Sequence, residues 1–227
     1  MRKCNLAAAM PSDSWSHRFS DKSKHQKRTV RTTSSSMVKS FFPTLKCGQR
    51  MEQLRCYSHV AMAWVLEMDP DVVRWSSKCS GIRVDDRDYT PDFVAHDRRG
   101  HTRFIRIVKT RSKKRAKVVA NFRAACESQA VLFTVESLDE LTSSVRVKVA
   151  EELYYHRYRD WPDGLAVTAA ESDASTLGEL HAELGATPEN WGQILSLVAN
   201  GLIEIDLNRE LAADTPILAR SYEGYAR

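Results

Sequence analysis

We expect the ordered part of the chain to begin near Phe41. Soon after that, hydrophobic residues recur at helical spacing. Between Glu52 and Met68 the apolar positions fall largely three and four residues apart, which predicts a helix. Asp69-Pro70 ends it, because the residue before a proline is disfavoured in helical backbone.

Shorter runs of β-forming residues follow this helix. We predict strands at 72–73, 82–84, 89–96 and 102–109, with turn chemistry at 85–88 and a hairpin turn at Arg98-Arg99-Gly100. A basic helix at 112–128, a strand at 130–135 and a helix at 138–156 complete the pattern. Helix, antiparallel strands, helix and a further strand favour an α/β sandwich.

A second pattern begins after the hinge-like cluster at 160–164. Ser175 is expected to cap a helix that stops at Gly185, and Thr187 with Pro188 starts another. Residues 202–207 then alternate as an edge strand does. Short helices followed by a strand are the outline of a small α+β winged-helix domain, which sets domains at 41–160 and 165–218. Its second helix carries Glu189 and no Lys or Arg, so we expect this domain to bind protein rather than phosphate.

The net charge of +5 is the difference between segments of opposite sign. Residues 1–40 hold nine Lys/Arg against two Asp, and residues 41–159 hold twenty-two Lys/Arg against fifteen Asp/Glu. Residues 160–219 hold one Arg against eleven Asp/Glu. A phosphate backbone attracts the first two segments and repels the third. The basic tail 1–40, rich in Ser and without apolar periodicity, is predicted to be disordered, either as a nucleic-acid arm or as a solvated tail.

Composition excludes several classes of protein. No run approaches eighteen apolar residues, and the apolar run before Pro11 is too short for a signal-peptide core, so we expect a cytoplasmic protein without a membrane partner. The five cysteines show no CxxC pair and no zinc spacing, so neither a disulfide framework nor structural zinc is expected.

The strongest candidate chemistry lies in Tyr89-Thr90-Pro91-Asp92-Phe93 followed by Ile107-Val108-Lys109. In PD-(D/E)xK nucleases, an Asp and an acid two residues before a Lys lie at the ends of paired strands and hold Mg²⁺, while the Lys orients the attacking water. A hairpin between Asp92 and Lys109 allows that geometry. A surface aspartate and an unrelated strand-end lysine are the alternative interpretation.

Longer stretches extend this similarity. FFPTLKCGQRMEQLRCYSHVAMAWVLEMDPDVVRW, YTPDF and FIRIVK resemble the nuclease domain of TnsA, the endonuclease subunit of heteromeric transposons, and TLGELHAELGATPENWGQILSLVANGLIEIDL resembles its winged-helix domain. The resemblance covers residues 41–218. It implies an α/β restriction-endonuclease-like core, a mixed sheet flanked by helices, followed by a winged-helix domain.

The resemblance assigns roles to individual positions. Asp92 matches the metal-binding aspartate and Lys109 the catalytic lysine, but Ile107 stands where an acid or amide is expected and His59 where the helix carries a catalytic Glu. His59 could ligate a softer metal or act as a base, or it could be a packed structural histidine. Glu52, two turns earlier on the expected helix, could substitute for that Glu only in a rearranged site.

Two hypotheses follow. The first is a TnsA-like endonuclease that uses Mg²⁺ or Mn²⁺ and cuts 5′ transposon ends beside a DDE-type transposase, with an AAA+ regulator as a further candidate partner. The second is a catalytically inactive nuclease-fold subunit, without a cofactor, that binds double-stranded DNA and docks partner proteins in a transposition or phage DNA-handling complex. In both, Lys113, Lys114 and Arg115 are candidate DNA contacts, although such a cluster is as often a solvated helix start.

Overall fold

The computed structural model describes residues 40–47, 51–77, 79–84, 86–109, 113–162 and 164–221. The tail predicted at 1–40 lies outside the described residues except for Ser40, which begins a strand. In chain order the elements are β1 (Ser40–Pro43), β2 (Met51–Leu54), α1 (Tyr57–Met68), β3 (Val72–Ser76), β4 (Ile82–Val84), β5 (Arg87–Tyr89), β6 (Phe93–Asp97), β7 (Thr102–Val108), α2 (Lys113–Ser128), β8 (Leu132–Ser137), α3 (Leu138–Ser143), α4 (Val145–His156), α5 (Leu165–Glu171), α6 (Leu177–Glu183), α7 (Pro188–Ala199), β9 (Ile203–Glu204) and β10 (Ala219–Arg220).

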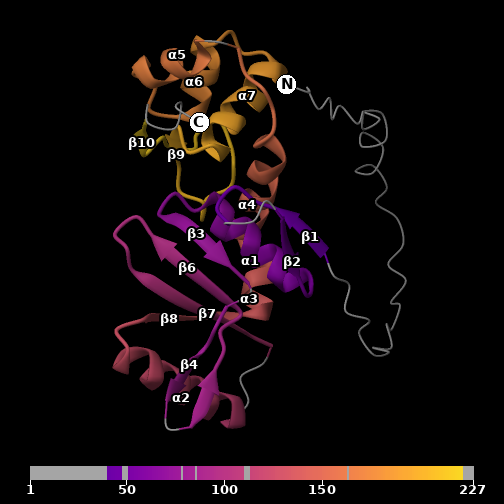
Figure 1. Cartoon of the computed structure of the whole chain (residues 1–227). Coiled ribbons are helices and arrows are strands. Elements are labelled where there is room, and N and C mark those ends of the chain that lie inside the picture. The colour runs from indigo at the N-terminus through magenta and orange to yellow at the C-terminus, as the bar shows by residue number, and fades with distance from the viewer. Residues whose placement is uncertain are drawn as a thin grey trace, which may run out of the picture. The chain divides into compact units, whose positions relative to one another are not determined.

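A four-stranded mixed sheet in the order β3-β6-β7-β8 forms the centre of the first half of the chain (Figure 1). β6 pairs antiparallel with both β3 and β7, and the β6–β7 turn ends at Gly100, whose φ of +82° suits a residue without a Cβ. α2 then carries the chain across, so that β8 lies parallel to β7. The predicted α/β architecture is confirmed as a mixed sheet flanked by helices.

Helices cover both faces of this sheet. On one face, Phe93 and Ile105 are buried in the same core as Leu66 of α1. On the other face, Phe104 packs against Phe122 of α2, with ring centroids 6.2 Å apart. Neighbouring residues of β7 face opposite layers because side chains alternate across a strand. The sheet is therefore the middle of three layers.

The helix predicted from Glu52 begins later, at Tyr57. Met51–Leu54 is instead strand β2, which pairs antiparallel with β1. Glu52 and Leu54 are its buried positions, a period-two pattern that a segment of four residues cannot separate from helical spacing by sequence alone. The expectation that Glu52 lies on the same helix face as His59 is therefore wrong.

Two further boundaries in the first half differ from the prediction. The strand predicted at 89–96 is two strands, β5 and β6, interrupted at residues 90–92. The helix predicted at 138–156 is broken at Ser144, whose hydroxyl accepts a hydrogen bond from the Val147 N–H and so caps α4. In both places the residues on either side of the break favour the same secondary structure, so the sequence pattern did not show the interruption.

The C-terminal segment follows its predicted order with shifted ends. Thr176, not Ser175, is the N-cap of α6, because Thr176 and Glu179 form a reciprocal capping box. The strand predicted at 202–207 is shorter, since only Ile203 and Glu204 pair with β10. A short helix, α5, precedes these elements and was not predicted.

The C-terminal segment is fastened to α4. Helix α7 is buried along 192–199 and packs against α4. At this contact, Ser196 Oγ donates to the Arg159 carbonyl (2.8 Å) and Asn200 Nδ2 donates to the Arg157 carbonyl (3.1 Å). Apolar residues of both halves belong to one continuous core.

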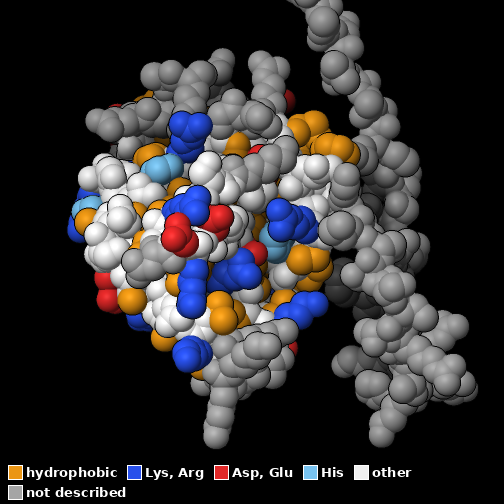
Figure 2. All heavy atoms as spheres, turned by 60° about the horizontal axis from the view of Figure 1, so that its bottom comes forward, with side chains coloured by type: hydrophobic (Ala, Val, Ile, Leu, Met, Phe, Trp, Pro, Cys, Tyr) orange, Lys and Arg blue, Asp and Glu red, His pale blue; other side chains and the backbone are white. Residues whose placement is uncertain are grey.

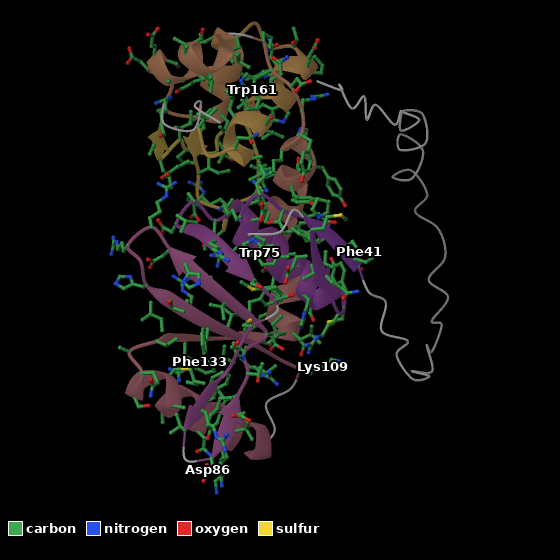
Figure 3. All side chains as sticks on the ribbon, viewed as in Figure 1. Phe41, Trp75, Asp86, Lys109, Phe133 and Trp161 are labelled. Atoms are coloured by element: carbon green, nitrogen blue, oxygen red, sulfur yellow. The ribbon has the colours of Figure 1, made fainter. Side chains whose placement is uncertain are left out.

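The carboxylate of Glu67 ties four segments of the chain together. It accepts hydrogen bonds from Thr44 Oγ1 (2.7 Å), Leu45 N (2.8 Å) and Trp75 Nε1 (2.6 Å). It also forms an ion pair with Arg157. Trp75 is labelled in Figure 3. Burial alone would raise the pKa of Glu67. The Arg157 charge and the bonds from Leu45 and Thr44 outweigh burial and hold that pKa below its usual range.

Glu67→Gln is expected to lower the free energy of unfolding by about 3–5 kcal/mol, because it leaves the Arg157 charge buried without a partner. Urea denaturation followed by circular dichroism measures the change. Glu127→Gln, at an exposed position of α2, is the matched control and should change stability by less than about 0.5 kcal/mol. Equal effects of the two substitutions would contradict a central role for Glu67.

Candidate functional site

Asp92 stands immediately before β6, with its carboxylate held against β7. Its N–H donates to the Ile105 carbonyl (2.9 Å), which continues the pairing of Phe93 with Ile105. Its Oδ2 accepts a hydrogen bond from the Ile107 N–H (2.8 Å), and its Oδ1 lies 3.5 Å from Arg106 Nη1. Only 15% of the Asp92 side chain is exposed. The backbone of β7 therefore orients this carboxylate.

His59 approaches the same carboxylate from α1. Its Nε2 lies 3.8 Å from Asp92 Oδ1, and its ring packs 5.2 Å from the ring of Phe93. The buried Nδ1 has no hydrogen-bond partner among the described residues. Burial lowers the pKa of His59; the Asp92 charge partly opposes this, and the charges of Arg55 and Arg106 lower the pKa further. The imidazole is therefore neutral at pH 7.

The end of β7 supplies a hydrogen bond but no second oxygen ligand. Ile107 contributes its N–H to Asp92, while its side chain packs against the main core. Lys109 follows the strand and is exposed (Figure 3). Ile107, two residues before Lys109, therefore orients the Asp92 carboxylate through its N–H and has no side-chain oxygen with which to bind a metal.

Glu52 is engaged elsewhere. Its Oε1 accepts hydrogen bonds from Ser77 N (2.9 Å), Ser77 Oγ (2.6 Å) and Ser76 Oγ (3.4 Å). Within the described part of the chain, no hydrogen bond or ion pair joins Glu52 to His59 or Asp92. The structure therefore brings together Asp92 and His59, and it gives Glu52 the separate task of fixing the loop after β3.

A cavity of about 370 Å³ opens beside Asp92. Burial raises the pKa of the Cys79 thiol in its wall to about 11, and the charges of Glu52 and Asp92 contribute to the rise. The thiol is therefore neutral at physiological pH. The lining residues are Arg55, Ser77, Cys79, Ser80, Thr90, Pro91 and Asp92.

The side chains at Asp92 do not supply the ligands that a hard divalent cation needs. Mg²⁺ takes several oxygens in near-octahedral geometry. Here Asp92 Oδ2 is already an acceptor for Ile107, and the guanidinium of Arg106 faces Oδ1, where its charge opposes a second cation. Across the described ranges, no group of three or more His, Cys, Asp or Glu residues is arranged to hold a metal.

The predicted DNA contacts Lys113, Lys114 and Arg115 open α2, where only their backbone is described. The β4–β5 hairpin and α2, at the bottom of Figure 1, turn toward the viewer in Figure 2, where Lys and Arg side chains surround a small group of Asp and Glu side chains. The exposed basic residues on these two elements include Arg83, Arg87, Lys117 and Arg123. This face is basic with a minority of acids, not uniformly basic.

Arg106 and Arg55 are residues of this site that the sequence interpretation does not name. For Arg106 a signal exists: the hairpin turn at 98–100 pairs Phe93 with Ile105, and one further step places Asp92 opposite Arg106. No comparable signal exists for Arg55, because it reaches the cavity through the packing of the loop after β2.

A scan against models of protein families finds no match to this chain, and a search of curated proteins finds no significant match. Among the residues that the structure describes, no helix is long and apolar enough to cross a membrane. The functional proposal therefore rests on the sequence resemblance and on the geometry of the residues around Asp92.

His59 is expected to make the fold less stable in mild acid. Because the folded pKa is depressed below the ordinary value of 6.5, the unfolded chain binds the proton first, so stability falls as the pH drops below about 6.5 toward the folded pKa. In His59→Gln, the decline in the free energy of unfolding between pH 7.5 and pH 5 should be smaller, as measured by urea titration at each pH. His96→Gln, on β6, is the control. An unchanged decline in His59→Gln would contradict the assignment.

Proposed function

We propose that this chain is a TnsA-like, nuclease-fold subunit of a DNA transposition complex, which binds double-stranded DNA and docks partner proteins without cleaving DNA through a metal at Asp92. The observation that carries the proposal is the state of the Asp92 carboxylate. It lies beside paired strands, as the resemblance implies. Its neighbours, however, are the Ile107 N–H, which donates a hydrogen bond to it, the Arg106 guanidinium and the His59 imidazole.

The order of elements supports the restriction-endonuclease-like part of this proposal. Helix α1, the antiparallel strands β3, β6 and β7, the crossover helix α2 and the parallel strand β8 follow one another as the resemblance leads us to expect. Asp92 stands immediately before β6 and Ile107 lies on the paired strand β7, close to where nucleases of this class place their metal ligands.

The C-terminal segment supports a winged-helix assignment. Three short helices precede the β9–β10 pair, and a lone bridge joins Thr176, before α6, to Pro216. The second of the paired helices, α7, is buried along 192–199 against α4, so that face is closed to a DNA groove. The exposed acids on this segment would repel phosphate and favour a basic protein partner. These acids are Glu171, Asp173, Glu179, Glu183, Glu189, Glu210 and Asp214.

The resemblance points to a DDE-type transposase as that partner, with an AAA+ regulator as a further candidate. Such a complex would divide its work: the partner cuts, and this chain holds DNA with its basic half and the partner with its acidic half. The single core shared by the two halves would keep both attachments at a constant spacing.

A metal-dependent endonuclease is the second candidate function. The observation in its favour is that Asp92 and an exposed Lys109 occupy the two positions that the family pattern requires of them. In that case Asp92 would hold Mg²⁺ or Mn²⁺ and the ion would stabilise charge on the phosphate. The remaining oxygens would have to come from outside the residues now at the site.

DNA binding by the full-length chain is expected to be salt-sensitive and to depend on the basic half. Replacing Lys113, Lys114 and Arg115 together by Gln should weaken binding to duplex DNA and reduce the slope of log K against log salt by up to about 3, as measured by fluorescence anisotropy. Glu183→Gln with Glu189→Gln, in the acidic segment, is the matched control and should leave the slope unchanged. An unaltered slope in the basic variant would argue against these contacts.

Restoring the missing ligands should restore metal binding. The double variant His59→Glu with Ile107→Glu supplies carboxylates at the two positions where the resemblance expects them, so it should bind Mn²⁺ in a calorimetric titration where the natural chain does not. Adding Asp92→Ala should abolish that binding. Nicking of supercoiled plasmid by the natural chain in Mn²⁺, lost in Asp92→Ala alone, would instead support the endonuclease.

A further inference from the structure

Two arginines from separate parts of the chain converge on the Asp92 carboxylate and its cavity. Arg106 Nη1 donates to the Thr90 carbonyl (3.0 Å) and lies 3.5 Å from Asp92 Oδ1. Arg55 lines the cavity that Thr90 and Asp92 also line. Both arginine charges lower the pKa of His59, in addition to the effect of burial.

Arg106 keeps most of its hydrogen-bonding capacity for another group. Its side chain is 43% exposed, and within the described residues it donates only through Nη1. Arg55 is exposed and has no hydrogen-bond or ion-pair partner among the described residues. A guanidinium presents its donors in a planar fork that fits two oxygens of a phosphate.

Arg55 and Arg106 bring two positive charges to the neighbourhood of Asp92, while Glu52, which bonds Ser77 in the cavity wall, adds a second negative charge. The charges therefore nearly balance, and recognition of a phosphodiester would rest on the available donors of the two arginines and not on a surplus of charge. In a metal-dependent nuclease, the positive charge beside this aspartate is a metal ion. Here the Arg106 guanidinium lies beside Asp92 Oδ1, where a metal ion would bind.

We propose that Arg106, which lies beside Asp92, binds a phosphodiester group of the DNA backbone without a divalent cation, assisted by Arg55 in the wall of the adjacent cavity. The inference rests on the proposed DNA-binding function and adds the place and the chemistry of one contact. Asp92 then serves as a positioning residue, because its Oδ1 faces the Arg106 fork while Ile107 holds its Oδ2.

Fluorescence anisotropy of a labelled random-sequence duplex with the full-length chain, in EDTA and at low salt, tests this contact. Arg106→Gln should weaken binding about tenfold. Arg106→Lys keeps the charge but loses the planar guanidinium, so its affinity should lie between those of the natural chain and Arg106→Gln. Arg99→Gln, in the exposed β6–β7 turn, is the matched control and should change affinity less than about twofold. Urea denaturation confirms that each variant is folded.

Two further measurements separate the arginine contact from a metal site. Replacing EDTA by Mg²⁺ should not tighten binding, and Asp92→Asn should bind DNA at least as well as the natural chain because it removes a negative charge. Tighter binding in Mg²⁺ that is lost in Asp92→Asn would overturn the inference, as would equal affinities for Arg106→Gln and Arg99→Gln. Failure of the natural chain to bind duplex at low salt would instead overturn the proposed function itself.

Discussion

The buried pair of Glu67 with Arg157 joins parts of the chain that local interactions cannot hold together. Glu67 lies near the end of α1, and its other partners come from the segment after β1 and from β3. The Glu67 charge is tolerated at this depth because both of its oxygens accept hydrogen bonds and Arg157 supplies the opposite charge. His59 sits about two turns earlier on α1, so the same anchor that fixes the helix against β3 also sets His59 against Asp92.

At the Asp92 site, the neighbouring groups determine what the carboxylate can bind. In a metal-dependent nuclease, oxygen ligands would gather around an ion at this point. Here a backbone N–H, a guanidinium and a neutral imidazole surround the carboxylate. The Ile107 N–H orients Asp92, and the Arg106 guanidinium offsets its charge. The proposed metal-independent contact and the proposed division of labour therefore depend on the same three neighbours.

Arg157 extends the anchor into the C-terminal segment. Its carbonyl accepts a hydrogen bond from Asn200, just after α7, while its guanidinium reaches Glu67. Helix α7 is buried at this contact along residues 192–199. Acidic residues of α5 and α6, such as Glu171, Glu179 and Glu183, remain exposed.

The sequence by itself determined the order of elements from α1 to β8, the hairpin turn at Gly100 and the start of α7 at Pro188, because periodicity, turn residues and capping are local signals. The sequence resemblance also pointed to Asp92, and it implied that Ile107 and His59 stand where oxygen ligands are expected. Only the tertiary structure decided that Glu52 lies on a strand and bonds Ser77, and that Arg55 reaches the Asp92 cavity. Those outcomes depend on pairing and packing between segments far apart in the chain, and such contacts leave no periodic trace in either segment.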